Sequence, residues 1–246
     1  MNLLVCISKT PDTTARISFK DDFTKFDESG IQFIMNPFDE FYSLVRAVEL
    51  KEQFGGTVTI LNVGPASNDI IIRKALAIGA DKAVRINAEP TSAMFVAKQI
   101  SEFVKDKNFD IIFFGKETID YNGGEVMGMV AEMLDLPYVH LASHLDVEGT
   151  TGKLDRDIEG GVEKVEVEMP FVVSASKGMA EQRIPNMRGI MMAKRKPLEV
   201  VEPVEANDLV EIVKYELPKE KSGVKLVDPE NVEELVRLLH EEAKVI

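Results

Sequence analysis

The stretch FDIIFFGKETIDYNGGEVMGMVAEML, residues 109–134, decides the fold class of this chain. Its first seven residues are a short, mostly apolar run that ends in glycine, which is typical of a strand buried on both faces. From Glu125 to Leu134, apolar side chains recur at helical spacing. The stretch therefore predicts a strand, a connection and a helix, the unit from which parallel sheets are built.

The alternation of strands and helices continues on both sides of this stretch. Asn36 and Pro37 are expected to start a helix, because asparagine is a good N-cap and proline is favoured at the first helical position. The repeats predict strands at 3–7, 57–63, 82–86 and 137–141, and helices at 37–53, 68–78 and 91–105, the last capped by Thr91. We therefore expect an α/β fold, with a parallel sheet covered by helices on both faces.

Two segments depart from this repetition. Residues 15–34 combine short apolar groups with polar turns, which predicts an irregular hairpin. Between 144 and 168, apolar and charged residues alternate. This pattern predicts a small antiparallel addition to the sheet, whose first pair of strands turns at Thr151-Gly152.

The last part of the chain changes composition. Residues 185–197 are basic and rich in methionine, and a final amphipathic helix is expected to start near Pro229. Little between them is periodic, so this part cannot bury a core of its own. We expect a boundary near 190, with residues 1–190 as the α/β domain and residues 191–246 as a C-terminal arm that lies on another surface.

The composition restricts the partners and the compartment. The 246 residues carry 42 acidic and 29 basic side chains, a formal net charge of -13, whereas binding to nucleic acid or to an anionic membrane needs a basic face. One cysteine, Cys6, allows no intramolecular disulfide. We recognise no secretory signal, and no stretch approaches the roughly 20 apolar residues that span a bilayer. We therefore expect a cytoplasmic protein that binds no nucleic acid and does not insert into a membrane.

Ligands of open parallel sheets bind beyond the carboxyl ends of the strands. Four connections are expected to leave such ends, after Ile7, Met35, Val63 and Phe114. The fourth is the longest, and it places Gly123-Gly124 directly before a helix, whose free N–H groups favour an anion such as phosphate. A plain loop is the alternative interpretation, because neither common nucleotide-binding fingerprint is present.

Other reactive side chains give weaker patterns. His140 and His144 have no cluster of cysteines or carboxylates at metal-ligand spacing, so we interpret them as structural histidines. Cys6 lies in a buried strand and is interpreted as a small core residue rather than a nucleophile. The basic residues around Arg188 could form an interaction patch or a solvated surface. We expect no metal site and no catalytic residue.

Several stretches together resemble the beta subunits of electron transfer flavoproteins. The residues that carry the resemblance keep the order and spacing of that family over nearly the whole chain. They are LLVCISKTPDT (3–13), MNPFDEF (35–41), RKALAIGADKAVRI (73–86), GKETIDYNGGEVMGMVAEMLDLP (115–137), DIEGGVEKVEVEMPFVV (157–173) and MRGIMMAKRKPLEV (187–200).

The resemblance implies a Rossmann-like fold of the adenine-nucleotide-binding type that buries one structural AMP. The family's contacts to AMP carry over onto the strand-end connections identified above. They fall on Cys6, Asn36, Pro37, Phe38, Asp39, Val63, Gly115, Lys116, Glu117, Thr118, Ile119, Asp120, Tyr121, Asn122, Gly123, Gly124, Glu125 and Val126.

The resemblance also implies partners. An alpha subunit would hold the redox FAD in a heterodimer and receive the C-terminal arm, and the pair would carry electrons from flavin dehydrogenases, such as acyl-CoA dehydrogenases, to a membrane quinone oxidoreductase. The chain would then be an electron carrier subunit and not an enzyme. The family's docking loop falls on 184–197, with Met187 as its anchor beside Arg188, Ile190 and Met191. Arg188-Gly189 departs from the usual Pro-Asn, which leaves the identity of the dehydrogenase open.

Two alternatives remain at this point. In electron-bifurcating relatives the beta site holds a second, redox-active FAD that oxidises NADH. Thr10-Pro11-Asp12-Thr13 is close to a motif that these relatives carry near the first strand. Tyr121-Asn122-Gly123-Gly124 matches neither the loop of the bifurcating relatives nor that of the AMP-binding members well. A bulky Tyr121 would fill space that the flavin ring needs, so AMP is favoured. A stand-alone nucleotide-binding protein on the same fold is the other alternative.

Overall fold

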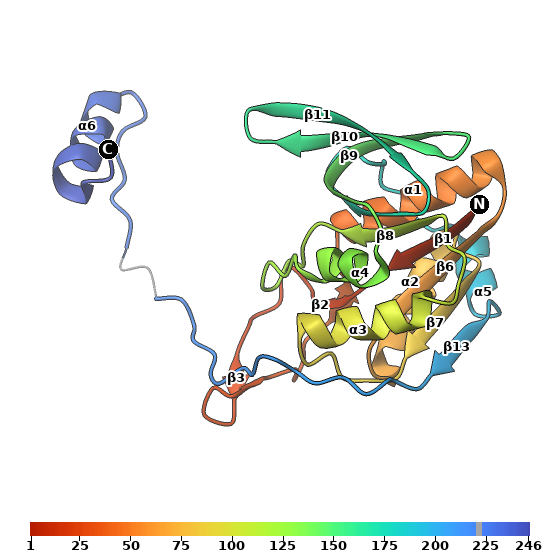
Figure 1. Ribbon diagram of the computed structural model, residues 1–246. Helices are drawn as coiled ribbons and strands as arrows, with labels where there is room; N and C mark the ends of the chain where they lie inside the picture. The colour runs from red at the N-terminus through yellow and green to blue at the C-terminus, as the bar shows by residue number, and fades with distance from the viewer. Residues whose placement is uncertain (220–222) are drawn as a thin grey trace. The chain divides into compact units, whose positions relative to one another are not determined.

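The computed structural model describes residues 1–219 and 223–246 (Figure 1). These residues form two compact units, each described here by itself. The first unit consists of Met1–Ile17 and Glu28–Ile212, and the second consists of Ser18–Asp27 and Val213–Ile246. No helix among the described residues is both long enough and apolar enough to cross a membrane.

The first unit is built on a sheet in which the described residues form nine strands, in the order β11-β10-β9-β12-β8-β1-β6-β7-β13 (Figure 1). Along the order from β9 to β13 all neighbouring strands are parallel, whereas β10 is antiparallel to both of its neighbours, β9 and β11. The strands are β1 (Asn2–Cys6), β6 (Thr57–Val63), β7 (Lys82–Ile86), β8 (Ile111–Gly115), β9 (Tyr138–Glu148), β10 (Thr151–Ile158), β11 (Gly161–Glu168), β12 (Phe171–Ala175) and β13 (Leu198–Val201). The predicted α/β fold with an antiparallel addition is confirmed.

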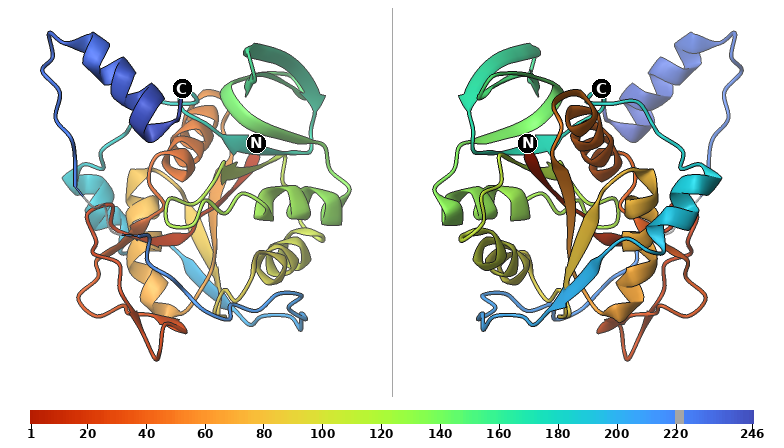
Figure 2. Two further views of the ribbon diagram at one scale, coloured as in Figure 1. Left: turned by 90° about the vertical axis from the view of Figure 1, so that its left-hand side faces the viewer. Right: turned by 90° about the vertical axis from the view of Figure 1, so that its right-hand side faces the viewer.

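Helices cover both faces of the sheet (Figure 2). On one face, Leu44 and Leu76 pack with Leu3 in one apolar core. On the other, Ile100 and Val130 form a second core cluster together with further strand residues. The first face carries α1 (Asp39–Phe54), α2 (Asp69–Ile78) with the short η1 (Ala66–Asn68) before it, and α5 (Met187–Ala193), and the second carries α3 (Ala93–Val104) and α4 (Val126–Leu134).

Three predicted local details are wrong. Helix α1 begins at Asp39 and has no side-chain cap, because the Asn36 amide is used elsewhere. The cap of α3 is Ser92 and not Thr91, since the Ser92 side chain accepts from the N–H of Phe95. Strand β9 ends at Glu148 and β10 begins at Thr151, so the turn between them lies at Gly149-Thr150 rather than at Thr151-Gly152.

The segment expected to leave the domain near residue 190 continues to pack within it. Helix α5 lies against α2, and β13 adds a parallel edge strand beside β7. The first unit extends to Ile212, so residues 191–212 belong to it and not to a separate arm. Their apolar positions alternate too briefly, and β13 is too exposed, for the sequence pattern to reveal them.

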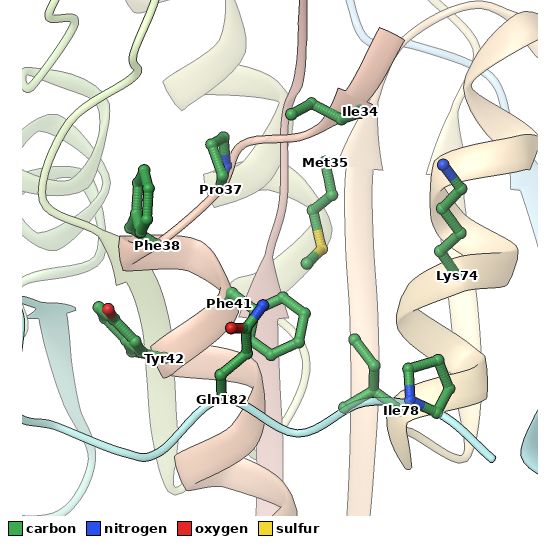
Figure 3. Close-up of a pocket in the computed structure, with 10 residues that line it drawn as sticks. Ile34, Met35, Pro37, Phe38, Phe41, Tyr42, Lys74, Ile78 and Gln182 are labelled. Carbon is green, nitrogen blue, oxygen red and sulfur yellow. The ribbon is translucent and has the colours of Figure 1, made fainter. Parts of the chain in front are cut away.

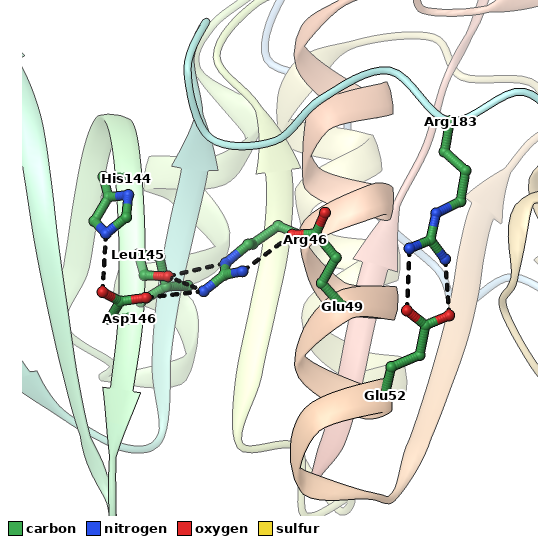
Figure 4. A network of polar contacts seen from close by, with 7 residues as sticks. All are labelled: Arg46, Glu49, Glu52, His144, Leu145, Asp146 and Arg183. Carbon is green, nitrogen blue, oxygen red and sulfur yellow. Dashed lines mark hydrogen bonds and ion pairs between the residues drawn. The ribbon is translucent and has the colours of Figure 1, made fainter.

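Two charged contacts hold neighbouring segments to α1 (Figure 4). Arg183, in the connection from β12 to α5, pairs with both carboxylate oxygens of Glu52 at 2.8 and 3.0 Å. Arg46 donates from Nε to the carbonyl oxygen of Leu145 in β9 at 2.9 Å and also pairs with Asp146. Helix α1 thus fixes the β9–β10 hairpin on one side and the approach to α5 on the other.

The second unit contains the hairpin of β3 (Phe19–Lys20) and β4 (Lys25–Phe26), with α6 (Val232–Arg237) and the π-helical turn η2 (Leu238–Ala243). The Phe19 ring stacks on Tyr215 at 4.6 Å between centroids. The irregular hairpin expected over 15–34 is therefore divided, because β5 (Phe33–Met35) pairs instead with β2 (Lys9–Pro11). The apolar residues of α6 are exposed, as a face without a partner would be.

Candidate functional site

The candidate site lies at the carboxyl edge of the sheet, where β1, β6 and β8 are neighbours. The strand ends at Cys6, Val63 and Gly115 therefore meet along one edge. Strand β5 belongs to a separate small sheet, so the connection after Met35 does not leave the main sheet as predicted. It reaches the site through Asn36 instead.

Asn36 joins three of the predicted connections. The residue is fully buried, and its backbone N–H donates to the carbonyl oxygen of Ser8 at 3.1 Å. Its side-chain amide donates to the carbonyl oxygen of Glu117 at 2.9 Å and accepts from the N–H of Ile119 at 3.0 Å. A buried amide with both ends paired fixes backbone position, because breaking either bond leaves an unsatisfied group. Asn36 is thus the tether of the 116–119 backbone.

Glu40 lies beneath this tether. One carboxylate oxygen accepts from the Ser8 N–H at 2.8 Å and the other accepts from the Ser8 hydroxyl at 2.6 Å. A Cβ on Gly115 would lie 2.9 Å from both the backbone nitrogen and the Cγ of Glu40. The glycine at the end of β8 therefore allows the first turn of α1 to approach the strand. Sequence reasoning missed Glu40, since an acidic residue in a first helical turn usually faces solvent.

Burial sets the protonation of three groups at this edge. Desolvation raises the pKa of Glu40 to about 8, with the Ser8 hydrogen bonds opposing the shift. Desolvation also raises the pKa of Asp39 to about 6, against the attraction of Lys116. Burial and the nearby Glu40 raise the pKa of the Cys6 thiol well above its usual value. Cys6 is thus a neutral thiol in the core, which agrees with its interpretation as a core residue.

The 116–125 connection closes on itself. Thr118 donates its N–H to the carbonyl oxygen of Gly123, and Asn122 donates its N–H to that of Thr118, both at 3.0 Å. The Thr118 hydroxyl accepts from the N–H of Gly123 at 3.0 Å. The Tyr121 ring covers Gly123, where a Cβ would come within 2.3 Å of it, yet 70% of Tyr121 remains exposed. The glycine therefore accommodates an aromatic side chain that is largely exposed to solvent.

The start of α4 offers unused donors beside this turn. Within residues 1–219 and 223–246, the backbone N–H groups of Gly124, Glu125 and Val126 donate to no protein acceptor, and α4 has no side-chain cap. Free N–H groups at a helix start carry partial positive charge and bind phosphate. A Cβ on Gly124 would lie 3.2 Å from the carbonyl oxygen of Lys116, so the backbone is close here. These donors fit the phosphate of a nucleotide.

The side chains around these donors are mostly acidic. Nζ of Lys116 lies 3.4 Å from Oε1 of Glu117, and Oε2 of the same carboxylate accepts from the Asn122 amide at 3.2 Å. This hydrogen bond from Asn122 is the main cause of the lowered pKa of Glu117. Asp120 and Glu125 are exposed at the rim. A phosphate at this site would therefore be held by backbone donors rather than by salt bridges.

A second polar group lies behind the end of β6. Asn62 donates to the carbonyl oxygen of Ile7 at 2.9 Å and accepts from the Asn68 amide at 3.0 Å. The Oδ1 atom of Asn68 is buried without a partner among the described residues. Buried Arg85 donates to the carbonyl oxygen of Gly64 at 3.0 Å. Asn62 could have been noticed in the sequence, because it is a polar residue near the end of an otherwise apolar strand. No comparable pattern marks Asn68 or Arg85.

Pro37 and Phe38 face a different hollow (Figure 3). Phe38 has a left-handed backbone with φ of 63° and is 59% exposed. A pocket of about 320 Å³ opens beside α1 and α2. Its walls are Ile34, Met35, Pro37, Phe38, Phe41, Tyr42, Lys74, Ile78, Gln182 and Pro185. The structure thus separates these two predicted contacts from the hydrogen-bonded strand-end cluster.

The histidines of β9 make structural contacts. The Nδ1 atom of His140 lies 2.8 Å from the Ser174 hydroxyl and 2.7 Å from the Tyr138 hydroxyl. Nε2 of His144 lies 3.0 Å from Asp146. Among the described residues, no group of three or more histidine, cysteine, aspartate or glutamate side chains is placed to hold a metal ion.

The predicted partner-binding residues lie on α5. Met187 is 75% exposed and Met191 is 67% exposed, and Arg188 and Ile190 are also exposed. Ala193 is the buried residue of this helix. Helix α5 therefore presents flexible apolar side chains to solvent beside basic ones, an arrangement that suits adaptable protein contacts.

Comparisons with known proteins give the family. Residues 24–206 match the family model described as electron transfer flavoprotein domain. The chain is similar to electron transfer flavoprotein subunit beta of Bacillus subtilis (37% identical, with 100% of both chains covered), of Syntrophomonas wolfei (34%, with 94% of this chain and 92% of the relative) and of Homo sapiens (31%, with 100% and 99%). By the extent of these matches and by its fold, this chain belongs to the electron transfer flavoprotein family, among its beta subunits.

Proposed function

We propose that this chain is the nucleotide-holding subunit of a cytoplasmic heterodimeric electron carrier. It pairs with an alpha subunit that bears the redox FAD, and it holds one AMP in the strand-end site. The carrier takes electrons from flavin dehydrogenases, such as acyl-CoA dehydrogenases, and delivers them to a membrane quinone oxidoreductase. The observation that carries the nucleotide assignment is the set of unused N–H donors at Gly124–Val126, beside backbone that Asn36 holds in place.

The residues of the site divide into two roles under this proposal. The N–H groups of Gly124, Glu125 and Val126 bind the phosphate, because they are free and lie at the positive end of α4. Asn36 and Glu40 hold the surrounding backbone, since their polar atoms already bond to Ser8, Glu117 and Ile119. AMP supplies no redox chemistry when bound and acts as part of the fold.

The beta chain contributes docking rather than catalysis. Its exposed Met187 and Met191 provide an apolar contact for a dehydrogenase, and the neighbouring Arg188 adds positive charge in a chain that is acidic as a whole. A few side chains carry most of the binding energy at protein interfaces, where methionine and arginine are enriched. The arm formed by the second unit, with its exposed α6 side chains, is proposed to bind the alpha subunit.

The experiment that tests this function measures the nucleotides of the purified heterodimer. Denaturation and chromatography should release one FAD and one AMP per heterodimer, and the isolated beta chain should be colourless. Two FAD molecules per heterodimer would instead support the electron-bifurcating alternative, for which the exposed Tyr121 ring leaves room if it swings outward. A beta chain that neither binds an alpha subunit nor carries a nucleotide would contradict the proposal as a whole.

A further inference from the structure

We propose that Arg73 and Lys196 are positioning residues that hold α5 in the orientation needed for dehydrogenase docking. This inference rests on the proposed docking role of α5. Helix α5 has seven residues and buries Ala193 alone. A helix this short is not stable by itself in water, so contacts from outside it must fix its direction.

Arg73 provides the first of these contacts. It extends from α2, and its Nη1 atom donates to the carbonyl oxygens of Ala193 at 2.7 Å and Lys196 at 2.6 Å. Both acceptors lie at or just beyond the end of α5, where backbone carbonyls lack partners within the helix. A guanidinium at this position satisfies them and also interacts favourably with the negative end of the helix dipole.

Lys196 makes the reciprocal contact. Its ammonium donates to the carbonyl oxygens of Leu76 at 2.9 Å and Ala80 at 2.5 Å, in and just after the last turn of α2. Each of the two segments therefore supplies a cation that caps the carbonyl end of the other. Removing either cation leaves partly buried carbonyl oxygens without a donor, which is costly.

The two helices also approach closely. A Cβ on Gly189 would lie 2.6 Å from the carbonyl oxygen of Ala77, so α5 lies directly on the last turn of α2 (Figure 2). The Asn186 side chain caps the start of α5 by accepting from the N–H of Gly189 at 2.8 Å. With one end capped by Asn186 and the other held by Arg73, the rotation of α5 is fixed and Met187 faces solvent.

The chain supplies a matched control for Arg73. Lys74 is the next residue of α2, carries the same charge and is exposed, and it makes no hydrogen bond or ion pair within the described part of the chain. Arg73→Met and Lys74→Met therefore remove the same charge, but the first alone removes the contact to α5. Any difference between them reports the contact rather than the charge.

The experiment uses the heterodimer with Arg73→Met, Lys196→Met, Lys74→Met or Met187→Ala in the beta chain. Turnover of a purified acyl-CoA dehydrogenase is measured with excess acyl-CoA while the carrier concentration is varied. Arg73→Met and Lys196→Met, the two clamp variants, should each raise the KM for the carrier by about five- to tenfold and leave kcat unchanged, because docking weakens while the FAD chemistry stays the same. Lys74→Met should leave both constants unchanged.

Two further measurements separate displacement of α5 from loss of the fold. The clamp variants should be cut faster by trypsin at Arg188 and Lys194, with the AMP content and the circular dichroism spectrum of the heterodimer preserved. If Met187→Ala raises KM but the clamp variants behave like Lys74→Met, the positioning role is overturned and docking at α5 stands. If Met187→Ala also leaves KM unchanged, the docking surface itself is wrong, and the positioning role fails with it.

Discussion

The replacement Glu40→Gln tests the electrostatics of the strand-end site. Glutamine has nearly the same shape as a protonated glutamate, so its oxygen can accept from the Ser8 N–H and its amide can donate to the Ser8 hydroxyl oxygen. Glu40 contacts the same two groups of Ser8 now, but the Ser8 hydroxyl donates to its carboxylate, so the direction of this second hydrogen bond is reversed in the variant. The substitution therefore removes the charge and keeps the hydrogen bonds.

The pKa of Glu40 sets the sign and size of the effect. It is about 8 in the folded chain against a reference value of 4.5, so the folded state holds a proton that the unfolded state has lost between these two pH values. The contribution of Glu40 protonation to stability is therefore fully present below pH 4.5 and is lost as the pH rises towards 8. The loss is about 1.4 kcal/mol per pH unit in this window, or roughly 3 kcal/mol between pH 5 and pH 7.

The assay compares urea unfolding of the wild-type and Glu40→Gln heterodimers at pH 5, 6 and 7, at one protein concentration, by circular dichroism. The free energy of unfolding of the variant should rise steadily relative to that of the wild type as the pH rises, because glutamine has no proton to lose. Glu132→Gln, which removes an exposed carboxylate from α4, is the control and should follow the wild type at every pH. Parallel wild-type and Glu40→Gln curves would refute the reasoning, since they would show that Glu40 ionises equally easily in both states.

Three shorter predictions concern the same molecule. Gly115→Ala should lower the free energy of unfolding by about 1–3 kcal/mol, because the new Cβ meets the Glu40 backbone nitrogen at 2.9 Å. Gly161→Ala, which has open space around it, should leave the free energy of unfolding nearly unchanged in the same measurement. Asn36→Ala should lower the free energy of unfolding by about 1–3 kcal/mol, speed hydrogen exchange at Ile119 and release the bound AMP. Unchanged exchange at Ile119 would argue against the tether. Met187→Ala should raise the dehydrogenase KM for the carrier without changing its Tm, because the side chain is 75% exposed.

The sheet could be predicted because its signal is local. Each buried strand, such as Ile111–Gly115, is a continuous apolar run, and the helices between the strands repeat at helical spacing. The local pattern does not reveal strand β13, because it is a four-residue edge strand whose two middle residues are exposed. It is defined by its backbone pairing with β7. The end of the first unit at Ile212 depends on that pairing, and so the boundary expected near 190 came too early.

The position of the candidate site at the strand ends could be predicted, but the contacts within it could not. The repeats predict parallel strands, whose carboxyl ends share one edge of the sheet, so the connections after β1, β6 and β8 could be assigned to that edge in advance. The partners of Asn36 could not, since they are backbone groups 81 and 83 residues away that only the closed fold brings near. Asn36 instead resembles a helix cap by its position before Pro37, a local interpretation that the distant contact overrides. Glu40 misleads for the same reason, because its burial depends on Gly115.

The chemistry of the proposed phosphate site explains why side-chain patterns reveal so little of it. Lys116 is the one cation of the 115–126 connection, and it already faces Glu117, while Asp120 and Glu125 add negative charge at the rim. Binding of an anion against that charge must come from the free backbone N–H groups at the start of α4, which every residue type except proline can supply. What the sequence can specify there is access to the donors. Glycine at 123 and 124 gives that access, because a Cβ would collide with the Tyr121 ring at one position and crowd the Lys116 carbonyl oxygen at the other.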